Sequence, residues 1–268
     1  MAGIRKVFPF DYFCCMDKFR YLVKLAFDGA PFHGWQVQSN AISVQEVITN
    51  ALEVRLQKEK ITLVGCGRTD TGVHASEFYA HFDLDENLHA DKLDELTYRL
   101  NKQLPNQIVI FSIRKVPYNF HARFSALSRT YRYYLHNRKD PFLDNYSWCL
   151  LYELDLTEMN RAASMMHEYE DFTSFARLHS QTETNICKVE RAQWEQDGHK
   201  YIFTITADRF LRNMVRAVVG TLVEVGRGKR TAGEFRRIIE IKDRSEAGKS
   251  APARGLFLEQ VLYPGQTG

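Results

Sequence analysis

Short hydrophobic runs separated by polar breaks fill the first half of the chain, and each run has the period of a particular element. Ser43 and Glu46 have the spacing of a capping box, and apolar residues at helical spacing follow. In chain order the predicted elements are a strand over residues 19–27, a helix after Ser43, strands over 61–64 and 77–84, a helix opened by Asp91, and a buried strand over 108–113. The order β-α-β-β-α-β is the ferredoxin-like, or split βαβ, unit.

The second half can be interpreted in the same way, from the order of its elements and not from repeated residues. In chain order the predicted elements are strands over 127–136 and 148–152, a helix over 156–166, a hairpin of strands 187–195 and 201–206, a helix from Leu211 to near Gly226, a helix over 232–241, and a strand over 256–262. The predicted fold class is therefore α+β, with two ferredoxin-like (split βαβ) halves. Their mainly antiparallel sheets are expected to lie side by side and to leave a groove where they meet.

The same patterns divide the chain into a domain over residues 17–117, a domain over 118–264 and a tail over 265–268. Residues 1–16 differ from the rest, because a second methionine, Met16, precedes the first convincing strand. Their apolar stretch is too short for a secretory signal. We expect a leader or upstream extension with little order; the alternative is a strand packed on the body.

Composition changes this picture little. Hydrophobic residues make up 44% of the chain and charged residues 26%, as in ordinary globular proteins. No apolar run approaches the roughly 18 residues that suggest a membrane span. The five cysteines include no CxxC pair, which argues against a disulfide framework or structural zinc and favours a reducing compartment. We therefore expect a cytoplasmic protein that does not associate with membranes.

The net charge of +3 is too small to indicate a partner, but its distribution is informative. The stretch over residues 121–139 contains no acid and several bases, namely Arg123, Arg129, Arg132, Arg138 and Lys139. A stretch of a single sign in a nearly neutral protein indicates a local surface for an anion such as a phosphate backbone. The alternative is a solvated strand face.

The most unusual stretch is the glycine-rich run over residues 65–75, which contains Arg68 and Asp70. Glycine permits sharp turns and close approach of the backbone to a ligand. Because predicted strands precede and follow the run, Asp70 is expected on a tight connection between strands, beside Arg68 and facing a cleft. The alternative is an Asx-type turn, in which the carboxylate bonds to its own backbone.

Several other signatures are absent or incomplete. The glycine-rich run has no lysine followed by Ser or Thr, so a P-loop is not predicted. His74, His81 and His89 do not have the spacing of metal ligands and are expected on the surface or in the core. Cys66 has no neighbouring histidine in sequence and is expected to be a small buried thiol.

Arginines and tyrosines remain as partners for the Asp70 carboxylate. Arg209, Arg212 and Arg216 recur at helical spacing at the start of the helix predicted from Leu211. This stripe could meet phosphate, pair with Asp70, or form a solvated helix edge. On the strand over 127–136, Tyr131 and Tyr133 share a face with Arg129, which suits base stacking beside a phosphate backbone but is also common in a sheet core.

Taken together, these motifs resemble the tRNA pseudouridine synthase A family, over residues 19–264. The matching blocks are Phe27-Asp28-Gly29 through Gly34-Trp35-Gln36, Ser43-Val44-Gln45, the run over 65–75, the run over 120–126, Tyr131-Arg132-Tyr133, the run over 171–175, the run over 210–220 and the run over 251–256. Departures from the family pattern are small, with Thr71 where alanine is usual and Phe32 where the family often has tyrosine.

The resemblance implies isomerisation of uridine to pseudouridine at positions 38, 39 and 40 of the tRNA anticodon stem-loop, without cofactor or metal. It implies Asp70 as the nucleophile, Tyr131 stacked on the base, Arg216 paired with Asp70, Arg68 in the space that the base leaves and Leu256 closing one side. It also implies a homodimer, with tRNA as the partner. A catalytically silent RNA-binding protein and a hydrolase that releases uracil are the alternative functions.

Overall fold

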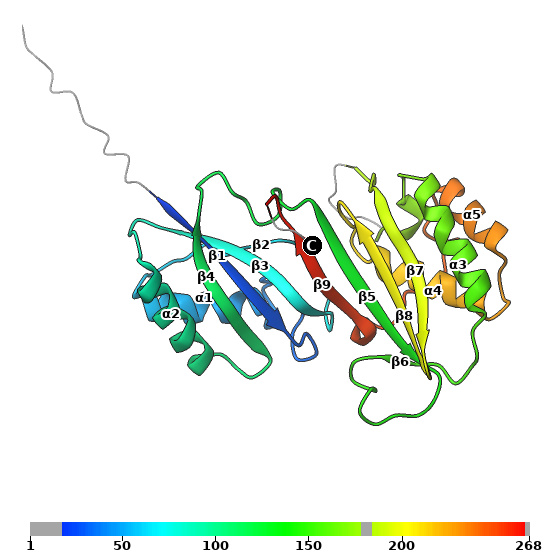
Figure 1. Ribbon diagram of the computed structural model, residues 1–268, viewed down its shortest axis with the longest axis horizontal. Helices are drawn as coiled ribbons and strands as arrows, with labels where there is room; N and C mark the ends of the chain where they lie inside the picture. The colour runs from blue at the N-terminus through cyan, green and yellow to red at the C-terminus, as the bar shows by residue number, and fades with distance from the viewer. Residues whose placement is uncertain (1–17, 178–183, 266–268) are drawn as a thin grey trace, which may run out of the picture.

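The computed structural model describes residues 18–177 and 184–265, so the predicted leader over 1–16 and all but the first residue of the tail lie outside the described residues. Its centre is a nine-stranded sheet of order β4-β1-β3-β9-β5-β8-β7, with β2 beside β3 and β6 beside β5 (Figure 1). The first half forms β1 (Phe19–Phe27), α1 (Val44–Leu56), β2 (Val64–Gly65), β3 (His74–Leu84), α2 (Ala90–Gln103) and β4 (Ile108–Val116). The second half forms β5 (Ser128–His136), β6 (Trp148–Cys149), α3 (Leu156–Ser164), β7 (Val189–Asp197), β8 (Lys200–Ala207), α4 (Met214–Gly226), α5 (Ala232–Ile241) and β9 (Leu256–Leu262).

Most neighbouring strands of this sheet are antiparallel, and the mixture of helices with such a sheet is consistent with the predicted α+β class. The exceptions are two short parallel pairs, β3 with β9 and β5 with β6. The last strand, β9, lies between β3 and β5, so it joins the first-half strands to the second-half strands. We call the β3–β9 pairing the seam.

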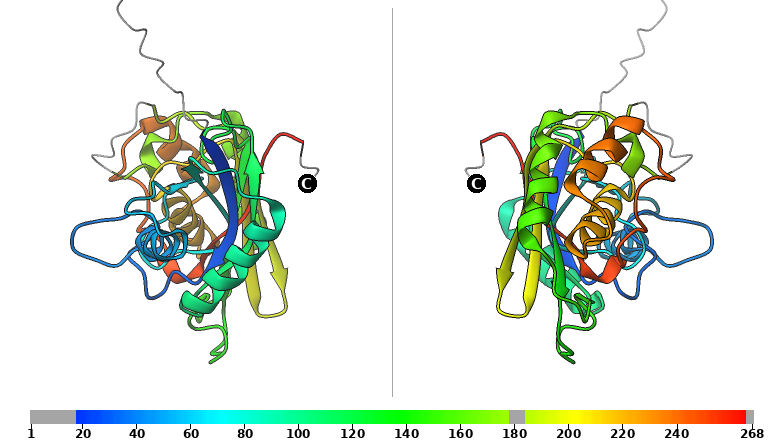
Figure 2. Two further views of the ribbon diagram at one scale, coloured as in Figure 1. Left: turned by 90° about the vertical axis from the view of Figure 1, so that its left-hand side faces the viewer. Right: turned by 90° about the vertical axis from the view of Figure 1, so that its right-hand side faces the viewer.

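The helices gather at the two ends of the sheet. Figure 1 and the end-on views of Figure 2 show α1 and α2 beside the first-half strands and α3, α4 and α5 beside β7 and β8. Trp35 stacks on Phe78 at a ring distance of 4.2 Å in the first end, and Trp194 stacks on Phe203 at 4.9 Å in the second. Each end therefore has its own aromatic packing, within one continuous core.

Several predicted boundaries are confirmed. β1, α5 and β9 have the predicted limits, and α1 begins after Ser43. The Ser43 hydroxyl accepts a hydrogen bond from the Glu46 backbone N–H, and the Glu46 carboxylate accepts one from the Ser43 N–H, as the capping box requires. The β7–β8 hairpin turns at Gly198, whose φ of 58° lies in the left-handed region that favours glycine.

Other boundaries differ for physical reasons. The strand over 108–113 was expected to be buried, but β4 lies at an edge of the sheet with α2 on only one face, and Phe111 is 52% exposed. The strands predicted over 61–64 and 148–152 shorten to two residues each, and β3 begins at His74. The helix predicted from Leu211 begins only at Met214, because Asn213 has a φ of 67°.

Among the described residues no helix is both long enough and apolar enough to cross a membrane. Cys66, Cys149 and Cys187 are free thiols, and Cys66 is fully buried as predicted. Burial raises the pKa of the Cys66 thiol to about 12, so it is protonated and unreactive at neutral pH.

One buried histidine ties β3 to the loop before β5. The His81 Nδ1 atom accepts a hydrogen bond of 3.2 Å from the Ala122 backbone N–H, and the His81 ring lies edge-on to His121 at 4.8 Å. Burial, together with the nearby Arg20 and His121, lowers the pKa of His81 to about 4, against a weaker opposite effect of Asp83. His81 is therefore a neutral core residue, which is one of the two positions predicted for it.

This lowered pKa predicts a pH-dependent stability. Below about pH 6.5 the unfolded chain protonates this histidine while the folded chain does not, so the free energy of unfolding falls as pH decreases from about 6.5 to about 4. The full contribution is about 3 kcal/mol and is present above pH 6.5. Urea unfolding of wild type and His81→Asn, whose amide oxygen replaces Nδ1, measures it. Between about pH 6.5 and about pH 4 the variant should lose less stability than the wild type. If the free energy of unfolding falls equally with pH in both proteins, the lowered pKa of His81 is contradicted.

Candidate active site

Asp70 lies on the loop over residues 66–73, between β2 and β3, as the sequence predicted. The loop is anchored where the Cys66 N–H donates to the Tyr79 carbonyl at 2.7 Å. It then turns, with the Val73 N–H donating to the Asp70 carbonyl at 3.1 Å and Gly72 at a φ of 76°. Positive φ at the third position of a tight turn is the requirement of a type II turn, which explains the glycine there.

A second loop lies directly against this turn, and two glycines make the contact possible. A Cβ on Gly34 would lie 2.3 Å from the Thr69 carbonyl oxygen, and the φ of Gly34 is 83°. A Cβ on Gly29 would lie 2.0 Å from the Val73 carbonyl oxygen. Both distances are too short for a real Cβ atom, so the backbones of the two loops are in direct contact. This contact fixes the position of the Asp70 backbone.

The Asp70 carboxylate faces two arginines. Arg216 Nη1 lies 3.3 Å from Asp70 Oδ2, and Arg212 Nε lies 3.6 Å from Oδ1. The Asp70 side chain is 19% exposed, so the group is screened from solvent but not closed off. Among the described residues its carboxylate makes no hydrogen bond to a backbone N–H of its own loop, so the Asx-turn alternative does not describe this side chain.

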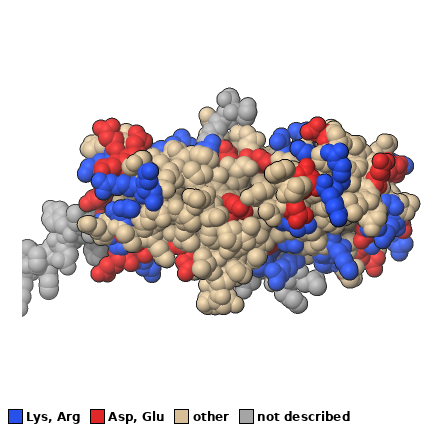
Figure 3. Space-filling model, turned by 90° about the horizontal axis from the view of Figure 1, so that it is seen from below, with Lys and Arg blue, Asp and Glu red and all other residues tan. Residues whose placement is uncertain are grey.

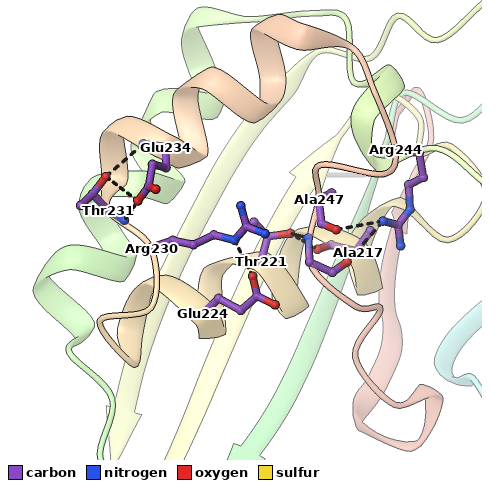
Figure 4. A network of polar contacts seen from close by, with 9 residues as sticks. Ala217, Thr221, Glu224, Arg230, Thr231, Glu234, Arg244 and Ala247 are labelled. Atoms are coloured by element: carbon purple, nitrogen blue, oxygen red, sulfur yellow. Dashed lines mark hydrogen bonds and ion pairs between the residues drawn. The ribbon is translucent and has the colours of Figure 1, made fainter.

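Arg216 is held in place by its own backbone contacts. Its Nε donates to the Ala251 carbonyl at 2.7 Å, and the Ala251 N–H donates to the Arg216 carbonyl at 2.9 Å. The segment that leads to Ala251 is fastened to α4 by a polar network, in which the Gly248 N–H donates to the Thr221 hydroxyl (Figure 4). Arg244 donates to the Ala247 carbonyl in the same network. The orientation of Arg216 therefore depends on the contacts that hold the segment over 244–251.

The arginine stripe predicted on the helix is split between a loop and the helix. Since α4 begins at Met214, Arg209 and Arg212 lie in the preceding loop, and Arg216 lies in the first turn. The left-handed φ of Asn213 breaks the helical period that the spacing suggested. Arg212 and Arg216 still meet at Asp70, although not along one helix face.

Tyr131 lies on β5 and is buried, with its ring edge-on to Phe210 at 5.1 Å. Burial raises the pKa of Tyr131, and the nearby Asp70 carboxylate adds to the rise. The hydroxyl is therefore protonated at neutral pH. The Asp70 carboxylate therefore lies within electrostatic range of the Tyr131 ring.

Leu256 is the first residue of β9 and is buried opposite Tyr133 in the β5–β9 register. The Tyr133 hydroxyl donates to the Pro252 carbonyl at 2.7 Å. Ala253 lies against Gly72, where a Cβ would be 3.4 Å from the Ala253 Cβ. The segment over 252–256 therefore lies beside the turn that follows Asp70, although the structure records no polar contact between Leu256 and the Asp70 loop.

Arg68 is exposed and belongs to a cluster of positive charge beside the Asp70 loop. Partial burial lowers the pKa of Arg123, and the charges of Arg68, Arg209 and Arg129 lower it further, so each of these three arginines lies within electrostatic range of Arg123. Several positive charges close to one another favour the binding of an anion. By contrast, the face seen in Figure 3 is mostly uncharged over its middle, with both signs mixed toward the ends.

Arg129 has a structural role that the sequence did not suggest. Its guanidinium donates to three backbone carbonyls, those of Cys66 at 3.0 Å, Arg123 at 2.6 Å and Asp208 at 2.8 Å. Each carbonyl belongs to a different loop around Asp70. Arg129 therefore uses its donors to hold these loops together, and it does not act as a free cation. The only signal for it in the sequence was an arginine on the strand face that also carries Tyr131.

No group of three His, Cys, Asp or Glu side chains within residues 18–177 and 184–265 is arranged to hold a metal ion. Within those limits, His74 and His81 are buried and His89 precedes α2.

Comparisons with known proteins identify the family of this chain. Residues 166–264 match a family model described as tRNA pseudouridine synthase. A tRNA pseudouridine synthase A from Bacteroides fragilis is 50% identical over 247 residues, which cover 91% of this chain and 96% of that protein. The chain belongs to the tRNA pseudouridine synthase A family. Proteins of the same name from Parabacteroides distasonis, at 48% identity, and Thermoanaerobacter sp., at 39%, cover 91% and 90% of the chain and 96% and 98% of their own lengths. The family is one of isomerases that act on tRNA.

The contact behind Asp70 predicts how Gly34→Ala affects this member of the tRNA pseudouridine synthase A family. The new Cβ must displace the Thr69 carbonyl and accept a left-handed φ, which alone costs about 1–2 kcal/mol. We expect a lower melting temperature and pseudouridine formation reduced by at least about 10-fold. Gly67→Ala is the matched control, because its Cβ would meet nothing within 4 Å. Equal activity of the two variants would contradict the proposed support.

Proposed function

We propose that this chain isomerises uridine to pseudouridine at positions 38, 39 and 40 of the tRNA anticodon stem-loop, with Asp70 as nucleophile and no cofactor. The single observation that carries the proposal is the Asp70 carboxylate held between Arg216 and Arg212, on a loop whose backbone is supported by another loop at Gly29 and Gly34. The family membership supplies the reaction, and this geometry supplies a candidate for each part of it.

The reaction makes three demands on a site. The C1′–N1 bond must break, the freed uracil must turn within the site, and C5 must bond to C1′ while the C5 proton is lost and N1 gains one. A carboxylate can stabilise cationic character at C1′ or bond to it, as in a retaining glycosidase. An attack on the base and an elimination route use the same carboxylate. Water must be excluded, because hydrolysis would release uracil.

The neighbours of Asp70 suit these demands. Arg216 and Arg212 hold the carboxylate in one orientation, and Arg216 is the proposed partner during catalysis. The buried Tyr131 ring suits stacking on the reacting base, and Leu256 supplies an apolar wall. Arg68 is free of the carbonyl contacts that occupy Arg129, so it suits entry into the space that the everted base leaves. Eversion costs a few kcal/mol, which phosphate contacts and stacking must offset.

We further propose that residues 17–117 and 118–264 are two ferredoxin-like domains and that the groove at the seam is the tRNA-binding cleft. The positions of Arg68, Arg123 and Arg209 around the Asp70 loop support a cleft that accepts an anionic backbone. A homodimer in the cytoplasm that binds tRNA and needs no metal completes the proposal.

Removing the proposed nucleophile tests the mechanism most directly. Asp70→Asn keeps the size of the side chain and should reduce pseudouridine formation by at least about 1,000-fold, while tRNA affinity stays within about threefold. Carbodiimide labelling of the product RNA measures conversion, and filter binding measures affinity. A variant that still makes pseudouridine at near wild-type rate would refute the role of Asp70. Release of free uracil by the wild type would indicate a hydrolase.

Arg216→Ala tests the ion pair. If Arg216 orients and stabilises the carboxylate, kcat should fall by about 100-fold with little change in tRNA affinity. Arg212→Ala is the comparison, because that side chain is farther from Asp70 and 55% exposed, and its effect should be smaller. The melting temperature of both variants must be measured, since Arg216 also binds the Ala251 carbonyl. A loss confined to affinity would contradict the ion-pair role.

A further inference from the structure

An aromatic ring stands exposed beside the positive cluster. Phe124 is 75% exposed, in the loop between β4 and β5. The His121 ring lies against it at 4.4 Å with an interplanar angle of 37°, and the Arg123 guanidinium lies over it at 5.4 Å. A single exposed phenylalanine is ordinary on a protein surface, and what distinguishes Phe124 is that a histidine ring and a guanidinium lie against it.

The loop presents this ring in a fixed orientation. The Arg123 and Phe124 backbone N–H groups both donate to His121 Nδ1, at 3.1 and 3.3 Å. The His121 N–H donates to the Ser125 hydroxyl at 2.9 Å, and the Tyr263 hydroxyl donates to the Ala122 carbonyl at 2.6 Å. A ring held this way loses little conformational entropy when a flat partner stacks on it.

His121 adds a second flat surface. Because its Nδ1 accepts two backbone hydrogen bonds, that nitrogen carries no proton. Burial and the charges of Arg20 and Arg123 lower the pKa of His121, so the ring is neutral at neutral pH. The exposed surface therefore combines a neutral imidazole ring, the Phe124 ring and the Arg123 guanidinium that lies over the Phe124 ring.

The loop of Phe124 is tied to the loop of Asp70. Arg129 Nη2 donates both to the Arg123 carbonyl and to the Cys66 carbonyl, at the start of the Asp70 loop. The positive charges that act on Arg123 include Arg68, two residues before Asp70. Phe124 therefore lies at the edge of the proposed site, on a support shared with Asp70.

We propose that Phe124, flanked by His121, is a stacking platform for one unpaired base of the tRNA substrate other than the reacting uridine. This rests on the proposed function. Arginines beside an exposed ring match the chemistry of a nucleotide, whose phosphate meets the cation while its base covers the ring. An apolar protein partner would have to bury Arg123 and Arg68 without a counter-charge, which is unfavourable. The platform holds the anticodon loop open while the uridine is everted.

Equilibrium binding to synthetic anticodon stem-loops tests the platform. Phe124→Ala should weaken affinity by roughly 10-fold, and Phe124→Trp should restore it, since one stacked base contributes about 1–3 kcal/mol. Tyr98→Ala is the matched control, because Tyr98 is a 64% exposed ring on α2 with Lys102 over it at 5.5 Å. The Tyr98→Ala variant should bind the stem-loop with wild-type affinity. All the variants should have the melting temperature of the wild type.

A second arm identifies the partner of the ring. A set of stem-loops is made in which each RNA lacks one base of the loop and keeps the reacting uridine. The affinity of each RNA is measured for wild type and for Phe124→Ala. When the missing base is the one that stacks on Phe124, the two proteins should bind with equal affinity. An affinity difference that persists at every abasic position, or no difference on the intact RNA, would overturn the platform. This comparison measures binding alone, so its failure is distinguishable from failure of the proposed function. The proposed function fails if the wild type converts no uridine to pseudouridine.

Discussion

The ion pair between Asp70 and Arg216 joins residues that are 146 positions apart, and the proposed chemistry depends on that meeting. Asp70 comes from the loop before β3, and Arg216 comes from the first turn of α4. They approach because β9 pairs with β3 at the seam and because the segment before β9 bonds to Arg216 through Ala251. Without this tertiary contact Asp70 would be one acid on a glycine-rich turn.

Close backbone contact is the second constraint on this region. Gly29 and Gly34 allow the loop after β1 to touch the Asp70 loop, and Gly220 allows α4 to touch the segment at Lys249, where a Cβ would lie 1.8 Å from the carbonyl oxygen. Backbone has fewer degrees of freedom than long side chains, so supports of this kind fix a carboxylate more firmly than surface packing would. The cost is a region that tolerates few substitutions.

The arginines around the site divide into two groups by what their donors bind. Arg129 donates to three carbonyls and Arg20 to the Asp83 carboxylate and the Phe120 carbonyl, so these two fasten loops to strands. Arg68 and Arg123 remain at the surface, where like charges crowd one another. Within the basic stretch over 121–139, Arg129 therefore binds carbonyls while Arg123 stays at the surface, and composition could not distinguish these two uses.

The sequence by itself determined the local features of this protein. The capping box at Ser43, the limits of β1, α5 and β9, and the turn of Asp70 between strands depend on hydrophobic period and backbone preference over a few residues. The family blocks also identified the reaction class. Only the tertiary structure decided that β4 is exposed on one face, that α4 begins at Met214 and that Arg129 binds carbonyls, because each depends on residues distant in the chain. Hydrophobic period reports whether a residue faces apolar surroundings, and it carries no information on which distant group a charged side chain will meet.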